Sequence, residues 1–268
     1  MNTRSLPLHT QKILASVEDG VGWVTFNNPE RRNAMSLEMW QGLGDAMHAL
    51  ERDESVRVVV MRGAGGKSFA AGADISEFEQ HRANAEQKKS YNDIASRAHR
   101  GMSQLGKPLI AMIEGFCIGG GLALALGADV RIATTASSFG IPAARLGLGY
   151  DYDGLAALAR LVGPSTAKDM LFSARFLDTG EALRVGLVNF AAEPHALEGH
   201  VRAYAARIAA NAPLTVYAAK AAVRLFEGYS NADSAAVAAL VDRCFDSDDY
   251  REGRTAFLEK RTPQFKGR

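Results

Sequence analysis

The stretch Glu114-Gly115-Phe116-Cys117-Ile118-Gly119-Gly120-Gly121-Leu122 decides how the rest of this sequence is interpreted. Three consecutive glycines stand directly before a short apolar run, which predicts a buried helix. The first turn of a helix carries backbone N–H groups without intrahelical partners, at the positive end of the helix dipole. Such groups are well placed to stabilise an oxygen that gains negative charge. The alternative is that the glycines only allow close packing of the helix on a strand.

The glycine pattern differs from two common nucleotide sites. A G-x-G-x-x-G sequence, which forms the dinucleotide-binding turn, is absent here. No Gly-Lys-Ser/Thr follows the glycines, so the stretch is not a phosphate-binding loop of the nucleoside triphosphatases.

Strands and helices alternate on both sides of this stretch, which predicts an α/β fold. Asp19-Gly20 between two β-type runs predicts a hairpin, and Ser36 is a good N-cap for a following helix. The expected strands are Ile13 to Val17, Val21 to Phe26, Val56 to Met61, Pro108 to Ile113, Asp129 to Ala133 and Leu187 to Phe190.

The pattern becomes entirely helical towards the C-terminus. Four helices are expected after Pro194, the last of them over Ser247 to Lys260. We therefore predict two regions, an α/β core over residues 1–195 and a helical lid or assembly region over residues 196–268. A polar segment from Glu77 to Gln104 predicts a solvated helix or, alternatively, a cover over a substrate pocket.

Composition limits the class of function. The 268 residues carry a formal net charge of +1, so no nucleic-acid-binding surface is expected. Two cysteines far apart and six histidines without paired spacing predict no disulfide framework and no metal site. The N-terminus lacks an apolar signal run, and no segment approaches the roughly 18 apolar residues of a membrane span. We expect a cytoplasmic protein with no membrane partner.

Two further segments hold candidate site residues. The first, Lys67 to Ile75, follows a buried strand and contains small residues that let a ligand approach the backbone. The second, Phe139 to Gly154, places two tyrosines and two aspartates in a glycine-rich loop. An aspartate in an apolar pocket can act as an acid or base, although a solvated turn is the alternative for at least one of them.

Taken together, five motifs in order resemble the enoyl-CoA hydratase/isomerase (crotonase) family over Ile13 to Phe265. They are the following: Asn28-Pro29-Glu30-Arg31-Arg32-Asn33-Ala34; Ala70-Ala71-Gly72-Ala73-Asp74-Ile75; Gly119-Gly120-Gly121; Phe139-Gly140-Ile141-Pro142 with Gly147-Leu148-Gly149; and Glu252-Gly253 with Ala256-Phe257-Leu258-Glu259-Lys260-Arg261. The resemblance implies a crotonase-like spiral of ββα units with a C-terminal helical trimerisation region.

The resemblance also implies an acyl-CoA substrate and a homo-oligomer, either a trimer or a dimer of trimers. The thioester carbonyl would lie between the N–H groups of Ala73 and Gly120. Coenzyme A would be part of the substrate, so no separate cofactor is expected. The residues that would line the coenzyme A site are Arg31, Arg32, Ala34, Ala71, Asp74, Ile75, Gly119 and Pro142.

The sequence departs from the family at the catalytic glutamates. Typical hydratases carry two glutamates at the positions that are Ala123 and Ala143 here. Asp151 falls where dienoyl-CoA isomerases carry a catalytic aspartate, and Tyr150 where methylmalonyl-CoA decarboxylases carry a tyrosine. We expect Asp151 to be the acid/base, Tyr150 to orient the substrate, and Asp153 to be the reserve candidate.

Three functions stay open from the sequence. The first is hydratase/isomerase-type chemistry through a thioester enolate. The second is decarboxylation of a malonyl-type (methylmalonyl-CoA-like) thioester, which forms the same enolate without a base. The third is a catalytically silent acyl-CoA-binding or RNA-binding protein, and the mixed charge around Lys88 and Lys89 argues against RNA. Dehalogenation is a more distant option, because it also needs an aryl-binding pocket and a base for the deacylating water.

Overall fold

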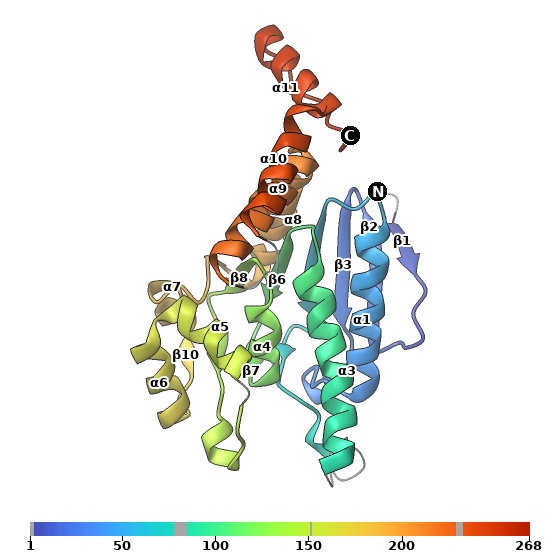
Figure 1. The fold of residues 1–268 in the computed structure, drawn as a ribbon. Helices are drawn as coiled ribbons and strands as arrows, with labels where there is room; N and C mark the ends of the chain where they lie inside the picture. Colours follow the sequence, from blue (N-terminus) through green and yellow to red (C-terminus); the bar gives the residue numbers. More distant parts are fainter. Residues whose placement is uncertain (1–2, 78–84, 151, 229–232) are drawn as a thin grey trace.

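The computed structural model describes residues 3–77, 85–150, 152–228 and 233–268, with the backbone alone for residues 75, 85, 88 and 153. Its strands form two sheets (Figure 1). The larger has the order β1-β2-β3-β4-β6-β8-β11 and the smaller the order β10-β9-β7-β5. The strands are β1 Thr3–Leu6, β2 Ile13–Glu18, β3 Val21–Phe26, β4 Val58–Gly63, β5 Ser68–Ala70, β6 Leu109–Ile113, β7 Phe116–Ile118, β8 Val130–Thr134, β9 Ser138–Gly140, β10 Leu177–Asp178 and β11 Phe190–Ala192.

The predicted hairpin is confirmed. Strands β2 and β3 pair antiparallel, and Asp19 and Gly20 both have positive φ, 49° and 80°. Two consecutive positive φ values match the twist of a two-residue hairpin turn, and Asp-Gly is a preferred pair for it. From β3 onwards the larger sheet is parallel, through β4, β6, β8 and β11.

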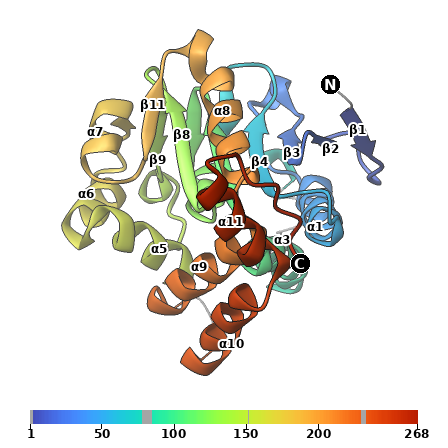
Figure 2. The same cartoon turned by 90° about the horizontal axis from the view of Figure 1, so that it is seen from above.

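Helices cover both faces of the larger sheet. One face packs against α1 and α3, which lie side by side, and the other packs against α8 (Figures 1 and 2). The helices are α1 Leu37–Arg52, α3 Ala85–Gln104, α4 Gly120–Leu126, α5 Tyr152–Val162, α6 Pro164–Ser173, α7 Thr179–Arg184, α8 Leu197–Ala209, α9 Pro213–Phe226, α10 Ser234–Phe245 and α11 Asp248–Glu259, with short 3₁₀ turns η1 Pro29–Arg31, η2 Ile75–Glu77, η3 Ala143–Leu146 and η4 Pro194–Ala196.

Local sequence explains where α1 and α8 lie. Ser36 caps α1 by accepting the Met39 N–H at 3.3 Å, as the sequence predicted. Helix α8 buries Leu197, Val201 and Ala205 against the sheet. These three residues recur every four positions and so form one apolar stripe.

Most expected strand boundaries agree with the structure within two residues, and two sequence-based boundaries differ by more. The final core strand was expected over Leu187 to Phe190, but β11 begins only at Phe190, because Leu187 and Val188 are buried in the turn after α7. The polar helix was expected from Glu77, whereas that residue ends η2 and α3 begins at Ala85.

The last three helices leave the body of the molecule as an arm (Figure 1). All four predicted C-terminal helices are present, and α11 with its caps spans Ser247 to Lys260 as expected. The division of the chain into regions 1–195 and 196–268 stays a prediction. In the described parts of the chain, every helix is too short or too polar to span a bilayer.

Candidate active site

The N–H of Ala73 is turned outwards by the way its segment pairs with Met35. Met35 N donates to Gly72 O at 2.7 Å, and Asp74 N donates to Met35 O at 3.0 Å. These two bonds form a parallel bridge between Met35 and Ala73. A residue flanked by such a pair of bonds directs its own N–H away from its partner. The Ala73 N–H therefore points away from Met35.

Gly120 is the first residue of α4, and its N–H has no intrahelical acceptor. The first helical bond runs from Ala123 N to Gly119 O. Gly119 has a φ of 58°, and its own N–H donates to Gly140 O at 2.8 Å. This bond fixes the direction from which the chain enters the helix.

The two segments meet at these N–H groups. A Cβ built on Gly120 would lie 3.6 Å from Ala73 N, and one built on Gly72 would lie 3.7 Å from Gly120 N. Neither the Ala73 N–H nor the Gly120 N–H has an acceptor in the described part of the chain. Two adjacent main-chain donors without acceptors are chemically suited to bind a carbonyl oxygen or an oxyanion.

The glycines of α4 have different roles. A Cβ on Gly121 would lie 1.9 Å from Ala70 O, so Gly121 is required for packing of the helix on β5. A Cβ on Gly120 would make only ordinary van der Waals contacts. Close packing thus explains Gly121 but gives no reason for a glycine at position 120.

Tyr150 lies next to this pair of donors. Its hydroxyl is 3.4 Å from the position of a Cβ on Gly119, and its ring packs against the main core. Tyr152, the other tyrosine of the loop, is 78% exposed. Asp151 lies outside the described residues, and Asp153 is in the first turn of α5.

The positions that carry glutamates in typical hydratases are both partly buried. Ala123 lies in α4 and Ala143 begins η3. Neither methyl group can transfer a proton. Pro142, a predicted site residue, precedes η3 directly and accepts the Arg145 N–H through its carbonyl.

Arg31 and Asp74 lie on one side of the site. Arg31 Nη1 donates to Ser76 Oγ at 2.9 Å and is 3.5 Å from Asp74 Oδ1. The buried Asp74 carboxylate also accepts the N–H and hydroxyl of Ser76, at 3.1 and 2.7 Å. The Arg31 side chain is 57% exposed, so it can reach an anionic ligand while it keeps these contacts.

The other predicted ligand residues form the nearby backbone. Arg32 O accepts the Ala71 N–H, and the Arg32 guanidinium stacks 5.0 Å from the ring centroid of Phe116. Ala34 O accepts an amide N–H from Asn28, and Ile75 begins η2.

Glu114 and Cys117 both lie in the segment that leads into the three glycines. Complete burial raises the pKa of the Cys117 thiol, whose Sγ lies 3.5 Å from Gly121 O, so the group stays protonated and is no nucleophile. Burial also raises the pKa of the Glu114 carboxyl, near Gly66.

Sequence reasoning missed two residues that shape the site. Phe176 occupies the space over Gly140, where a Cβ would lie 2.4 Å from its ring, and Gly140 O holds the Gly119 N–H. Asn33 is completely buried and was noticed only as part of a motif. A buried asparagine could have been suspected from its apolar neighbours Ala34 and Met35, but the position of Phe176 depends on the tertiary fold.

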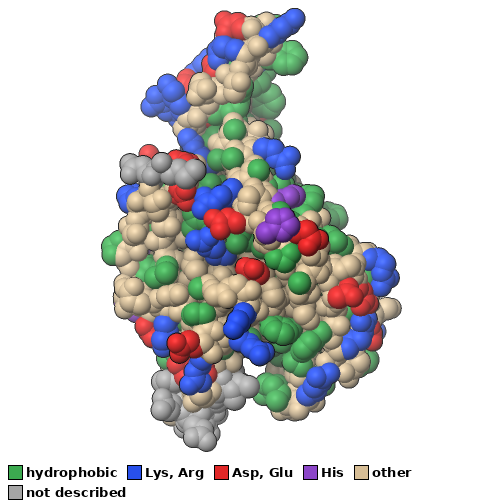
Figure 3. Space-filling model, turned by 180° about the vertical axis from the view of Figure 1, so that it is seen from behind, with side chains coloured by type: hydrophobic (Ala, Val, Ile, Leu, Met, Phe, Trp, Pro, Cys, Tyr) green, Lys and Arg blue, Asp and Glu red, His purple; other side chains and the backbone are tan. Residues whose placement is uncertain are grey.

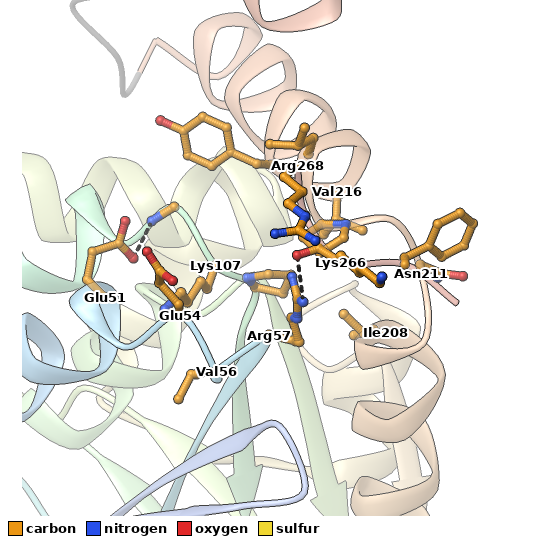
Figure 4. Close-up of a pocket in the computed structure, with 17 residues that line it drawn as sticks. Glu51, Glu54, Val56, Arg57, Lys107, Ile208, Asn211, Val216, Lys266 and Arg268 are labelled. Carbon is orange, nitrogen blue, oxygen red and sulfur yellow. Dashed lines mark hydrogen bonds between the residues drawn. The ribbon is translucent and has the colours of Figure 1, made fainter. Parts of the chain in front are cut away.

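A separate cavity of about 790 Å³ lies where strands β4 and β6 of the larger sheet begin (Figure 4). Val56 and Pro108, which line it, precede strands β4 and β6, whereas Ala73 and Gly120 follow β5 and β7. Arg57 closes part of it by donating to Lys266 O at 3.2 Å. In the described residues no group of three or more His, Cys, Asp or Glu side chains could hold a metal ion.

The enoyl-CoA hydratase/isomerase family model matches residues 16–268. The chain belongs to this family. It is 34% identical to a short-chain-enoyl-CoA hydratase of Clostridium acetobutylicum over 95% of this chain and 97% of the relative. It is also 34% identical to an (E)-benzylidenesuccinyl-CoA hydratase of Thauera aromatica, over 95% and 99% of the two chains.

Solved structures of the family share the fold. A crystal structure of an enoyl-CoA hydratase/carnithine racemase from Magnetospirillum magneticum superposes with a TM-score of 0.90, at 38% identity and over 97% of both chains. The expectation of a crotonase-like α/β fold is thereby confirmed, as is the family of acyl-CoA enzymes to which the chain belongs.

Proposed function

We propose that this family member binds the carbonyl oxygen of an acyl-CoA thioester between the N–H groups of Ala73 and Gly120. The proposal is supported by the proximity of these two donors and by the lack of any acceptor for them in the described residues. As the thioester becomes an enolate, fixed donors stabilise the charged oxygen more than the neutral carbonyl. Losing one such donor typically costs about 2.7–4 kcal/mol of barrier.

The coenzyme A part of the substrate would extend from this site towards Arg31. Its exposed guanidinium is held by Asp74 and Ser76, and an arginine so fixed can pair with phosphate. Arg32, Ala34, Ala71, Ile75, Gly119 and Pro142 complete the proposed binding surface. No cofactor besides the substrate's own coenzyme A is part of the proposal.

The reaction that fits best is enolate chemistry with a single acid/base, such as double-bond isomerisation. Alanines at positions 123 and 143 leave no pair of carboxylates to handle water. Asp151 is the proposed base and follows Tyr150 directly in the sequence. A base in this role removes a proton next to the carbonyl, and the electron pair moves onto the oxygen held by the two N–H groups.

A second candidate is decarboxylation of a malonyl-type thioester. The Tyr150 hydroxyl beside Gly119 favours it, because a neutral donor there can orient the leaving carboxylate without removing a proton. The C–C bond to the carboxylate breaks and CO₂ leaves. The electron pair of that bond stays with the acyl group and forms the same enolate. Without either reaction, the chain would be a silent acyl-CoA-binding protein.

Binding of the carbonyl can be tested without knowing the reaction. We expect the infrared stretch of a carbon-13-labelled thioester to fall in frequency when it binds the wild-type protein. Gly120→Ala should lose much of this shift, because its methyl group would lie over Ala73 N while the fold accommodates it. Gly44→Ala in α1 is the matched control, with a new methyl group 3.8 Å from Ala98 Cα. A wild-type protein that binds the thioester without any shift would disprove the proposal.

The reaction can be identified with a substrate panel and two variants. The panel contains a 2-enoyl-CoA, a 3-enoyl-CoA and malonyl- and methylmalonyl-CoA. Isomerisation abolished by Asp151→Asn, with acyl-CoA affinity retained, supports the first candidate. Release of CO₂ that is lowered by Tyr150→Phe and retained by Asp151→Asn supports the second. Binding without turnover on the whole panel supports the silent protein.

We also propose a homo-oligomer, a trimer or a dimer of trimers, located in the cytoplasm. The arm formed by α9, α10 and α11 exposes large apolar side chains to solvent (Figure 3), and Phe226, Phe257 and Leu258 are 91%, 84% and 79% exposed. Exposed apolar patches of this kind mark contact surfaces.

A further inference from the structure

We propose that Asn33 is the positioning residue that sets the direction of the Ala73 N–H. The inference rests on the proposed function, because it assigns a cause to the geometry of one of the two donors. Asn33 does not touch the proposed position of the thioester. Its effect would pass through the backbone of Met35.

The Asn33 side chain is completely buried, and each of its polar atoms is used. Nδ2 donates to Ala64 O at 2.9 Å and to Ser68 O at 2.8 Å, while Oδ1 accepts the Asn28 N–H at 2.9 Å. This amide therefore fixes its loop to the connection between β4 and β5. Ser68 begins β5, the strand that leads into Ala73.

The same residue turns the chain. Arg32 and Asn33 have consecutive left-handed φ values of 52° and 56°, which asparagine tolerates better than most residues. After this turn, Met35 runs beside residues 72–74 and forms the bridge that leaves the Ala73 N–H pointing outwards. Asn33 thus holds both sides of the bridge, Met35 by the turn and the Ala73 segment through Ser68.

The surroundings leave little choice of side chain. A Cβ on Gly63 would lie 2.8 Å from Asn33 Nδ2, so the amide lies directly against the backbone of β4. Aspartate has the same shape, but it would set an oxygen against the carbonyls of Ala64 and Ser68. Glycine keeps the backbone conformation and removes all three side-chain bonds. Together, these two substitutions distinguish the contribution of the side-chain hydrogen bonds from that of the left-handed turn.

The test measures the bound thioester in Asn33→Asp and Asn33→Gly. The control is Asn27→Ala, which removes an amide bond to Gln11 O of 2.9 Å in the same loop. For each variant, fold is checked by circular dichroism, affinity by calorimetry with the acyl-CoA, and polarisation by the carbon-13 thioester stretch. The frequency shift belongs to the bound ligand, so a lower folded fraction does not change it.

We expect folded Asn33 variants to bind acyl-CoA but to lose at least half of the wild-type frequency shift. On the substrate that the panel identifies, kcat should fall about 10- to 100-fold, less than for complete loss of a donor. Asn27→Ala should keep the full shift.

Three results would overturn the inference. They are a full wild-type shift in the Asn33 variants, loss of acyl-CoA binding by folded variants, and loss of the fold in both. The second would make Asn33 a ligand residue and the third a residue of the fold alone. A wild-type protein without a shift would instead contradict the proposed function and leave no donor for Asn33 to position.

Discussion

Arg261 and Glu252 form a bidentate ion pair across the end of α11. Nη1 and Nη2 of the guanidinium lie 2.6 and 2.9 Å from the two carboxylate oxygens. Glu252 also accepts the Gln264 N–H, and a Cβ on Gly253 would lie 3.5 Å from the Phe265 ring. The pair therefore fastens the C-terminal tail to the helix, and both of its residues belong to the last sequence motif.

Removing this pair should loosen the tail without unfolding the protein. In Arg261→Ala we expect faster hydrogen exchange at the Gln264 N–H, since its acceptor Glu252 loses the partner that fixes it. The Lys266 and Gly267 N–H groups should stay protected, because they donate to Asp249 at 2.6 and 2.8 Å. Equal exchange at Gln264 in variant and wild type would contradict this account.

The same pair predicts how the tail responds to acid. The Arg261 guanidinium lowers the pKa of Glu252 to about 2. A lowered pKa means that the contact stabilises the folded form at neutral pH and is lost as the pH falls through about 2. Tail fastening should therefore persist at pH 4, where a free glutamate, with its ordinary pKa of 4.5, is already mostly protonated. Exchange at Gln264 measured at pH 4 and 7, corrected for the intrinsic rate, checks this expectation.

The glycines at positions 120 and 121 should differ sharply when each is changed to alanine. Gly121→Ala forces a methyl group to within 1.9 Å of Ala70 O, so we expect a loss of stability of about 1–3 kcal/mol or more. The Gly120→Ala protein should unfold close to the wild-type melting temperature. It should instead lose the infrared frequency shift of the bound thioester carbonyl. Thermal unfolding of both variants decides the matter, and equal melting temperatures would show that α4 is not packed as described.

Lys220 should make the attachment of the arm depend on pH. Its side chain is only 8% exposed, and its Nζ donates to Lys107 O and Asp129 Oδ2, both at 2.6 Å. Burial lowers the pKa of Lys220 to about 8. Between about 8 and the ordinary lysine value the unfolded chain binds more protons, so this residue's contribution to stability rises with pH.

A comparison with Lys220→Met isolates this contribution from other titrating groups. The melting temperature of the wild type minus that of the variant should be larger at pH 9.5 than at pH 7.5. Arg224, which donates to Ser103 O at 2.6 Å and to Leu105 O at 3.0 Å, keeps the helix attached in both proteins. A difference that shrinks as the pH rises would show that the charged form of Lys220 is the favoured one.

The exposed apolar residues of the arm predict the effect of charge on assembly. Replacing Phe257 and Leu258 together by Lys should shift the protein towards the 28.7 kDa monomer, because two charges would be buried in the proposed contact. Light scattering after size exclusion measures the change. The matched control is Phe172→Lys, which is 77% exposed on α6, away from the arm. If the wild-type protein is itself a monomer, the proposed oligomer is wrong.

Much of the fold could be predicted because it follows from local patterns. Asp19-Gly20 requires positive φ values, and Ser36 supplies the cap that α1 needs. The smaller sheet was missed, since its strands are two or three residues long and pair only through the tertiary fold. The start of β11 was missed for a related reason, because buried apolar residues in the preceding turn resemble a strand in the sequence.

The candidate site was predicted where the backbone forms it and less fully where side chains do. Glycine spacing pointed to the turn at Gly120, because the first turn of a helix has backbone N–H groups without intrahelical partners and the patterns of the two common nucleotide sites are absent. The contribution of Phe176 could not be foreseen, as nothing in the local sequence places it over Gly140. The Asp151 assignment still rests on the sequence, since that residue lies outside the described chain.

The two donors at Ala73 and Gly120 belong to the main chain, so they do not depend on the side chain at their own positions. Substitutions around them can replace an acid, a base or a whole acyl pocket without removing the amides themselves. Descendants of one ancestor could thus exchange one reaction for another while retaining the proposed hydrogen bonds from these amides to a carbonyl oxygen. Reaction type in such a lineage is better inferred from the residues that border the amides than from overall similarity.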